Sequence, residues 1–130
     1  MVSTAGNPWG VLMLRGGRAG SNYSPDMLLD ARNRLEQAGL KPRVIVDCSH
    51  ANSGKDHRRQ SIVFRDVLKQ RIEGDRSIVG VMLESNINPG KQQPNQDRSV
   101  LKYGVSITDA CIGWDETDAL LREAYNSLGE

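Results

Sequence analysis

This sequence has almost no net charge, few cysteines and no apolar run of membrane length, and each of these shortages argues against a class of protein. The 130 residues carry 17 basic and 16 acidic side chains, so the formal net charge is only +1. General binding to nucleic acid or to a charged membrane surface usually needs a basic excess, which is absent here. No apolar run approaches the ~20 residues that a membrane-spanning helix needs. The composition therefore favours a globular chain, although its hydrophobic fraction of 38% is low.

The sequence contains only two cysteines, Cys48 and Cys111, which lie in different contexts and form no CxxC pair. Residues 1–10 show no signal peptide. Free thiols in a reducing cytosol are therefore favoured over a disulfide. We expect a cytoplasmic protein in which both cysteines are small buried residues and not metal ligands.

Strand patterns and helix patterns alternate along the chain. Continuous apolar stretches at 10–14, 44–47 and 78–83 predict strands, and the first reads as a strand covered on both faces. Three helical patterns follow these stretches, with predicted N-caps at Ser24, Asp56 and Asp115 and apolar residues at spacings of three and four. Repeated strand–helix units predict an α/β fold with a parallel sheet, and the length suits one domain.

The apolar positions expected to be buried can be given helix by helix. They are Leu28, Ala31, Leu35 and Ala38 in the first helix; Val63, Phe64, Val67, Leu68 and Ile72 in the second; and Leu120, Leu121, Ala124 and Leu128 in the third.

Polar, chemically capable side chains stand where each predicted strand ends. The stretch 44–52 (VIVDCSHAN) runs directly from apolar residues into Asp47 and His50, and Arg15 and Glu84 follow the other two strands. Asp109 lies in the short apolar stretch 105–114. The carboxyl ends of parallel strands meet at one edge of a sheet, so we expect these side chains to converge. A cation, an imidazole and several carboxylates together suit a metal site that binds an anionic substrate.

Each of these residues also has a simpler interpretation. His50 could simply form hydrogen bonds with its neighbours in 49–53 and have no further role. Glu84 ends an apolar strand, where it needs either a cation partner or a metal, and spacing does not separate the two. Asp109 could cap a helical turn at 110–112. Arg15 precedes two glycines, which suits an anion site, although RGG is a short motif.

Two further stretches carry weaker functional signals. The basic cluster at Lys55, His57, Arg58 and Arg59 is typical of a solvated helix start, and phosphate binding at a helix N-terminus is the alternative. Residues 86–104 are rich in Asn, Gln and Pro, and a loop of this length is usually functional or mobile.

Several motifs in order resemble one enzyme family. They are LRGG at 14–17, NYS at 22–24, DCSHANSGK at 47–55, GVMLES at 80–85 and YGVSITDACIGWDETDALLR at 103–122. Together they resemble the class I 3-deoxy-D-arabino-heptulosonate 7-phosphate (DAHP) synthases, also called phospho-2-dehydro-3-deoxyheptonate aldolases. These enzymes open the shikimate route to aromatic amino acids. The resemblance runs from Gly6 to the end of the chain.

The resemblance implies a fold, a reaction and a set of site residues. The fold is a (β/α)8 barrel, of which residues 1–130 would be a single partial domain holding the last three βα units. The reaction condenses phosphoenolpyruvate with erythrose 4-phosphate, releases phosphate and needs a divalent metal. His50, Glu84 and Asp109 would be metal ligands, and Arg15 would bind phosphoenolpyruvate, so that His50 and Arg15 are the catalytic residues. Such ligands do not distinguish manganese, iron, cobalt and zinc.

The resemblance also shows which parts of the family pattern find no match. These are a cysteine metal ligand on the first barrel strand, a lysine–proline–arginine motif for the sugar phosphate, and further lysine and arginine contacts to phosphoenolpyruvate. Three strands cannot close a barrel, and they leave edges and an apolar face uncovered. We therefore expect the missing N-terminal barrel half or another synthase subunit as a partner, or else marginal stability. The alternative function is a non-catalytic remnant that binds metal or a full-length synthase subunit.

Overall fold

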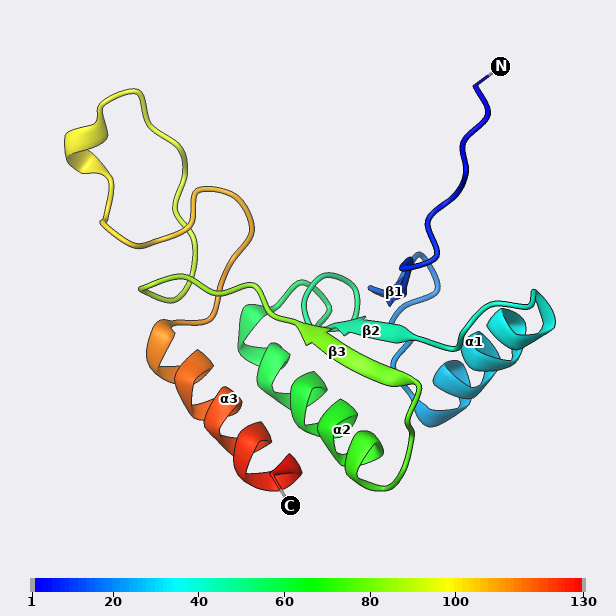
Figure 1. The fold of residues 1–130 in the computed structure, drawn as a ribbon. Coiled ribbons are helices and arrows are strands. Elements are labelled where there is room, and N and C mark those ends of the chain that lie inside the picture. The colour runs from blue at the N-terminus through cyan, green and yellow to red at the C-terminus, as the bar shows by residue number, and fades with distance from the viewer. Residues whose placement is uncertain (1, 130) are drawn as a thin grey trace.

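The computed structural model describes residues 2–129 as a sheet with helices packed against it (Figure 1). The elements in order are β1 (Leu12–Leu14), α1 (Pro25–Gln37), β2 (Val44–Asp47), the 3-10 helix η1 (His57–Arg59), α2 (Gln60–Ile72), β3 (Ile78–Met82), the 3-10 helix η2 (Arg98–Val100) and α3 (Trp114–Leu128). Within these residues no helix is both long enough and apolar enough to cross a membrane.

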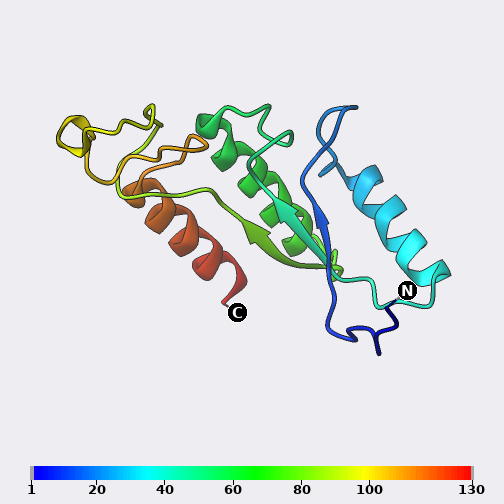
Figure 2. The ribbon, with the colours of Figure 1, turned by 90° about the horizontal axis from the view of Figure 1, so that it is seen from above.

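The sheet has the strand order β1-β2-β3, and both neighbouring pairs are parallel. Leu14 pairs with Val46, and Asp47 pairs with Met82, so the strands end near the same edge. Figure 2 shows the loops that follow β1, β2 and β3 along that edge. The predicted α/β fold with a parallel sheet is confirmed. The edge that gathers the strand ends is where the candidate site lies.

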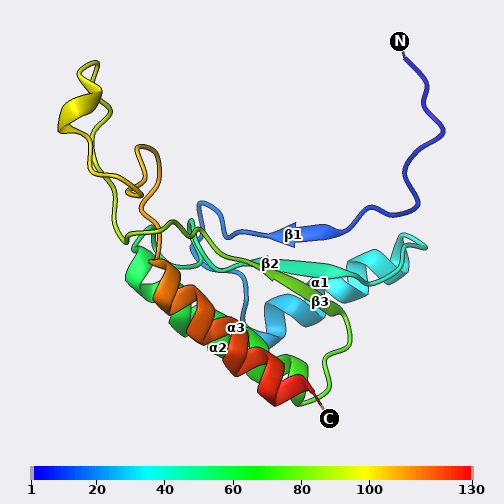
Figure 3. The same cartoon turned by 60° about the vertical axis from the view of Figure 1, so that its left-hand side comes forward.

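The helices α1, α2 and α3 lie on one side of the sheet (Figure 3). Successive strand side chains point to opposite faces, so Val44 and Val46 are buried against the helices while Ile45 points the other way. On that other face Met13 is 43% exposed. The prediction that the first strand is covered on both faces is therefore wrong, because no helix among residues 2–129 lies over this face. The open face is nevertheless apolar.

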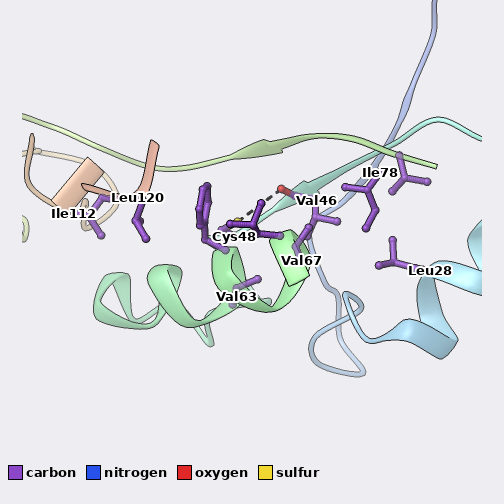
Figure 4. Close-up of a cluster of buried hydrophobic side chains, with 11 residues drawn as sticks. Leu28, Val46, Cys48, Val63, Val67, Ile78, Ile112 and Leu120 are labelled. Atoms are coloured by element: carbon purple, nitrogen blue, oxygen red, sulfur yellow. Dashed lines mark hydrogen bonds between the residues drawn. The ribbon is translucent and has the colours of Figure 1, made fainter. Parts of the chain in front are cut away.

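The hydrophobic core lies between the sheet and the helices (Figure 4). Val46 of β2 meets Val63 and Val67 of α2 in this cluster, and Leu28 of α1 and Leu120 of α3 extend it at either end. Burying such side chains is worth about 1.5–3 kcal/mol each relative to exposure. This cluster supplies the packing that holds β2, and with it the strand end, in place.

Some of the predicted buried positions are exposed. Ile72, Leu121 and Leu128 each keep about half of their surface exposed, and Ala38 is also exposed. Leu121 and Leu128 line an apolar groove where α3 passes beside α2 and β3. Periodicity identified the apolar face of each helix, but each face is wider than the part that packs against the sheet or a neighbouring helix.

Two of the predicted helix caps stand elsewhere. The Oδ1 atom of Asp56 accepts the backbone N–H of Arg58 at 3.1 Å, so Asp56 caps η1, and α2 begins only at Gln60. Gly113 is the N-cap of α3, while Asp115 lies in the first turn. An acid in the first turn still interacts favourably with the positive end of the helix dipole, which explains the misplaced prediction. Ser24 is the N-cap of α1 as predicted.

Candidate metal site

His50, Glu84 and Asp109 meet at the carboxyl edge of the sheet. The Nε2 atom of His50 lies 3.5 Å from Oε1 of Glu84 and 3.9 Å from Oδ2 of Asp109. One ligand atom from each residue lies within 4.8 Å of the other two. Ligand atoms about 2.0–2.2 Å from one metal ion lie about 3–4 Å from each other, so these spacings fit a shared ion. A nitrogen and carboxylate oxygens also suit a divalent transition metal.

The imidazole of His50 is held from the side opposite these carboxylates. Its Nδ1 atom lies 2.7 Å from Oδ2 of Asp47, the last residue of β2. The backbone of His50 has a positive φ of 48°, and its carbonyl oxygen accepts the N–H of Lys55 at 2.7 Å. The simpler interpretation proposed a neighbour in 49–53 as the hydrogen-bond partner of the His50 ring, but that partner is Asp47. The strained turn directs Nε2 toward Glu84.

Glu84 is fixed through both its side chain and its backbone. The hydroxyl of Ser49 donates to Oε2 of Glu84 at 2.6 Å, and the side chain of Gln60 pairs with the Glu84 backbone. Among residues 2–129, Nε2 of His50 lies 3.5 Å from Oε1 of Glu84, and no lysine or arginine nitrogen lies within 4.0 Å of this carboxylate. The alternative of a lysine or arginine partner for Glu84 thus finds no such side chain at contact distance in the described part of the chain.

Asp109 comes from the long segment between β3 and α3. Cys111 and Gly90 exchange backbone hydrogen bonds at 2.9 and 3.1 Å, and the N–H of Ile112 donates to the carbonyl oxygen of Glu84 at 2.9 Å. Residues 110–112 therefore run extended beside other backbone, and the alternative in which Asp109 caps a helical turn there is wrong. The carboxylate itself is exposed, with 69% of the side chain open to solvent. It can therefore reach a ligand without losing a protein partner.

Arg15 reaches the same edge from the end of β1, and a chain of amides fixes its loop. Asn22 accepts the N–H of Gly16 at 2.7 Å and donates its own N–H to Oδ1 of Asn52 at 2.8 Å. The amide of buried Asn52 donates to the carbonyl oxygens of Leu14 and Asp47, at 3.0 and 2.8 Å. Asn52 thereby ties the ends of β1 and β2 together.

These amides were missed by the sequence reasoning. The available signal was Asn52 in the polar stretch that follows β2 and also holds His50. Gly16 adds a second constraint, because a Cβ built on it would lie only 2.7 Å from that of Ala51. The backbone after Arg15 therefore packs closely against the loop that carries His50.

Arg15, Lys55 and Lys91 bring positive charge to the pocket that holds the carboxylates. They line one pocket of about 360 Å³ together with His50, Glu84 and Asp109. The prediction treated Lys55 as part of a solvated helix start, and Lys91 carried no signal in the Asn/Gln/Pro-rich segment. Cations around a carboxylate cluster fit an anionic ligand that binds beside a metal. The pocket thus combines candidate metal ligands with basic side chains suited to an anion, which are the two features that the strand ends predicted.

The two cysteines are free and buried, as predicted. Burial is the main cause that raises the pKa of the Cys48 thiol to about 12, and the nearby Asp47 carboxylate raises it further. Burial also raises the pKa of Cys111. Both side chains therefore stay as neutral thiols near neutral pH, which is the form that neither attacks electrophiles nor binds metals well.

Comparison with known proteins shows that the sequence of this chain is similar to one enzyme family. The profile of the DAHP synthetase I family matches residues 1–122. The Tyr-sensitive phospho-2-dehydro-3-deoxyheptonate aldolase of Salmonella typhimurium is 54% identical over 128 residues, which are 98% of this chain and 36% of the relative. The phenylalanine-inhibited aldolase of Saccharomyces cerevisiae is 44% identical over 127 residues, which are 93% of this chain and 34% of the relative.

A solved structure gives the same result in three dimensions. The phospho-2-dehydro-3-deoxyheptonate aldolase from Francisella tularensis superposes with a TM-score of 0.89 at 39% identity, and the match covers 95% of this chain and 36% of that one. The chain thus spans about a third of the length of these relatives. Nearly all of it has a counterpart in them, while most of each relative has no counterpart here.

Proposed function

Because this chain belongs to the DAHP synthetase I family, we propose that it is the C-terminal part of a class I DAHP synthase. Such an enzyme condenses phosphoenolpyruvate with erythrose 4-phosphate and releases phosphate. The observation that carries this proposal is the meeting of His50, Glu84 and Asp109 in a pocket that Arg15 also lines. The reducing environment that free cysteines indicate fits a cytoplasmic location.

His50, Glu84 and Asp109 would hold the divalent metal that this reaction needs. A metal bound there supplies a Lewis acid for the aldehyde carbonyl of the sugar phosphate. The donor set suits manganese, iron, cobalt and zinc alike, so it leaves the choice among them open. Ser49 and Gln60 hold Glu84 in position before any ion arrives, which lowers the cost of ordering the site.

Arg15 would bind phosphoenolpyruvate. A guanidinium presents a planar fork that pairs with two oxygens of a carboxylate or a phosphate. The amide chain through Asn22 and Asn52 fixes the loop after Arg15 against the loop that carries His50. The anion would therefore be held beside the metal ligands, in the same pocket.

The described strands would be the last three of a (β/α)8 barrel, and residues 1–130 a single partial domain of it. Parallel strands with helices on one face are the repeating unit of such a barrel, whose other face is a packed interior. The apolar open face with Met13 and Ile45 fits that interior. We propose that the N-terminal barrel half or another synthase subunit covers this face and completes the site.

A second candidate function is a binding module without turnover, which takes up metal or associates with a full-length synthase subunit. One observation favours it: the three metal-facing side chains all come from this chain, which spans about a third of its relatives. Metal binding could therefore occur without the remaining strands.

An assay of phosphate release tests the proposal. The purified chain is mixed with phosphoenolpyruvate, erythrose 4-phosphate and Mn²⁺, with and without a polypeptide that carries the first two thirds of the Salmonella relative. We expect turnover only in the mixture, its loss in Glu84→Gln, and no change in the control Glu36→Gln, whose side chain is exposed on α1. Activity of the chain alone would contradict the need for the other strands. Metal binding without turnover in any mixture would favour the binding module.

A further inference from the structure

Asp47 lies behind His50, on the side away from the proposed metal. We propose that Asp47 is a positioning residue that sets the tautomer of His50, so that Nδ1 carries the proton and the lone pair of Nε2 faces Glu84 and Asp109. This inference rests on the metal site proposed above and goes beyond it, because it assigns a role to a residue that touches neither metal nor substrate.

Both oxygens of the Asp47 carboxylate have assigned partners. The backbone N–H of Ser49 donates to Oδ1 at 2.8 Å, and Oδ2 lies 2.7 Å from Nδ1 of His50. The Asp47 side chain is completely buried, so it takes no hydrogen bonds from solvent. An ionised carboxylate only accepts hydrogen bonds, and therefore Nδ1 of His50 must donate. In the neutral ring the other nitrogen, Nε2, then keeps its lone pair.

That lone pair of Nε2 points toward the carboxylates of Glu84 and Asp109. Nε2 faces Oε1 of Glu84 at 3.5 Å and Oδ2 of Asp109 at 3.9 Å. The turn that carries His50 is fixed by two donors to its carbonyl oxygen, the N–H of Lys55 at 2.7 Å and the hydroxyl of Ser53 at 3.2 Å. Ring and backbone are thus held together, and a carboxylate behind a metal-binding histidine raises its basicity as a ligand.

A purely structural role for Asp47 makes a different prediction from a positioning role. The backbone N–H of Ser49 needs an acceptor, and an asparagine at position 47 could supply one with its amide oxygen. The amide NH2 would then face Nδ1 of His50 and could only donate. Asp47→Asn would thus keep the shape and the Ser49 bond, but it would place the ring proton on Nε2. The nitrogen that faces Glu84 would lose its lone pair.

The tautomer can be measured directly, without metal and without activity. Long-range ¹H–¹⁵N correlation spectra of the ¹⁵N-labelled chain, at mildly alkaline pH, distinguish the two neutral forms of a histidine ring. The sequence has two histidines, His50 and His57, so the variant His57→Gln assigns the signals. We expect Nδ1–H for His50 in the unmodified chain and Nε2–H in Asp47→Asn.

Zn²⁺ affinity is the second readout. A competition titration should show a loss of about 10–100-fold in Asp47→Asn, the range for partners that orient metal ligands. The control is Asp75→Asn, the same change at a carboxylate that accepts the backbone N–H of Ser77 at 3.0 Å. This control should change neither the His50 tautomer nor the affinity.

An Nε2–H tautomer in the unmodified chain would overturn the inference, even if Asp47→Asn failed to fold. An Asp47→Asn chain that keeps Nδ1–H, or that binds Zn²⁺ within twofold of the unmodified chain, would overturn it as well. Failure of the unmodified chain to bind Zn²⁺, with His50 in the Nδ1–H form, would contradict the proposed metal site while supporting the assigned role of Asp47 in setting the tautomer.

Discussion

Gln60 and Glu84 are joined by two hydrogen bonds in opposite directions. The Nε2 atom of Gln60 donates to the carbonyl oxygen of Glu84 at 3.0 Å, and the backbone N–H of Glu84 donates to Oε1 of Gln60 at 2.8 Å. Gln60 is the first residue of α2 and is completely buried. Its side chain thus acts as a strand partner for the residue that follows β3 by two positions, and it fixes the backbone of a proposed metal ligand.

The variant Gln60→Met should destabilise the chain and loosen the site together. It keeps the length of the side chain but leaves the N–H of Glu84 unpaired, while the carbonyl oxygen of Glu84 keeps the N–H of Ile112 as its donor. We expect a cost of about 1–3 kcal/mol. Urea denaturation measures this loss. The control Gln37→Met changes an exposed glutamine at the end of α1 and should stay within about 0.5 kcal/mol. Equal stability of the two variants would contradict the role of Gln60.

The variant Ser49→Ala should weaken metal binding more than it weakens the fold. Ser49 is buried, and its hydroxyl holds Oε2 of Glu84 at 2.6 Å, which leaves Oε1 facing His50. Without this bond we expect about 10-fold weaker Zn²⁺ binding by competition titration. Ser127→Ala removes an exposed hydroxyl on α3 and should bind Zn²⁺ like the unmodified chain. Unchanged affinity in Ser49→Ala would show that the hydroxyl does not orient the ligand.

Cys48 should report on folding through its reactivity and its titration. Burial raises the pKa of this thiol from about 9 to about 12, so the folded chain keeps the proton that the unfolded chain releases in between. Stability from this group is therefore fully present below about pH 9 and is lost as the pH rises toward 12. The fall in unfolding free energy over this range should be smaller in Cys48→Ala.

The same burial predicts that a thiol reagent modifies Cys48 only as the chain unfolds. Rates of reaction with Ellman's reagent in increasing urea would follow the unfolding transition measured by circular dichroism. Rapid modification of Cys48 in the absence of denaturant would contradict the buried core around β2.

Met13 should matter for association and little for the chain alone. It is 43% exposed on the open face of the sheet, where we propose that the rest of the barrel docks. Met13→Lys would place a charge in that interface and should abolish binding to the N-terminal polypeptide, measured by sedimentation. Met27→Lys is a matched control, since Met27 is 50% exposed on α1, on the other side of the sheet. Equal binding by both variants would place the partner elsewhere.

The parallel sheet and the positions of the polar strand ends followed from sequence because both depend on local patterns. Apolar runs and cap residues predict βα units, and the geometry of parallel strands then gathers the residues that follow each strand. The convergence of His50 and Glu84 follows from this geometry, whereas Asp109 lies in the segment between β3 and α3 and was expected beside them from its apolar stretch and the family resemblance.

The groups that orient these residues could not be predicted in the same way. Gln60 is 24 residues from its partner Glu84, and Asn52 is 38 residues from Leu14. Amide side chains give no periodic signal, and only the folded chain decides which backbone groups they meet. The predicted burial of the first strand was wrong for a related reason. A continuous apolar run indicates that both faces of a strand need cover, but it does not tell which chain supplies that cover.

We propose above that His50, Glu84 and Asp109 bind one shared metal ion. Crystals of the chain grown with Zn²⁺ and measured at the zinc absorption edge test it directly. We predict one strong anomalous peak about 2.0–2.2 Å from Nε2 of His50 and from a carboxylate oxygen of Glu84 and of Asp109. Saturating Zn²⁺ with no peak between these three side chains would contradict it.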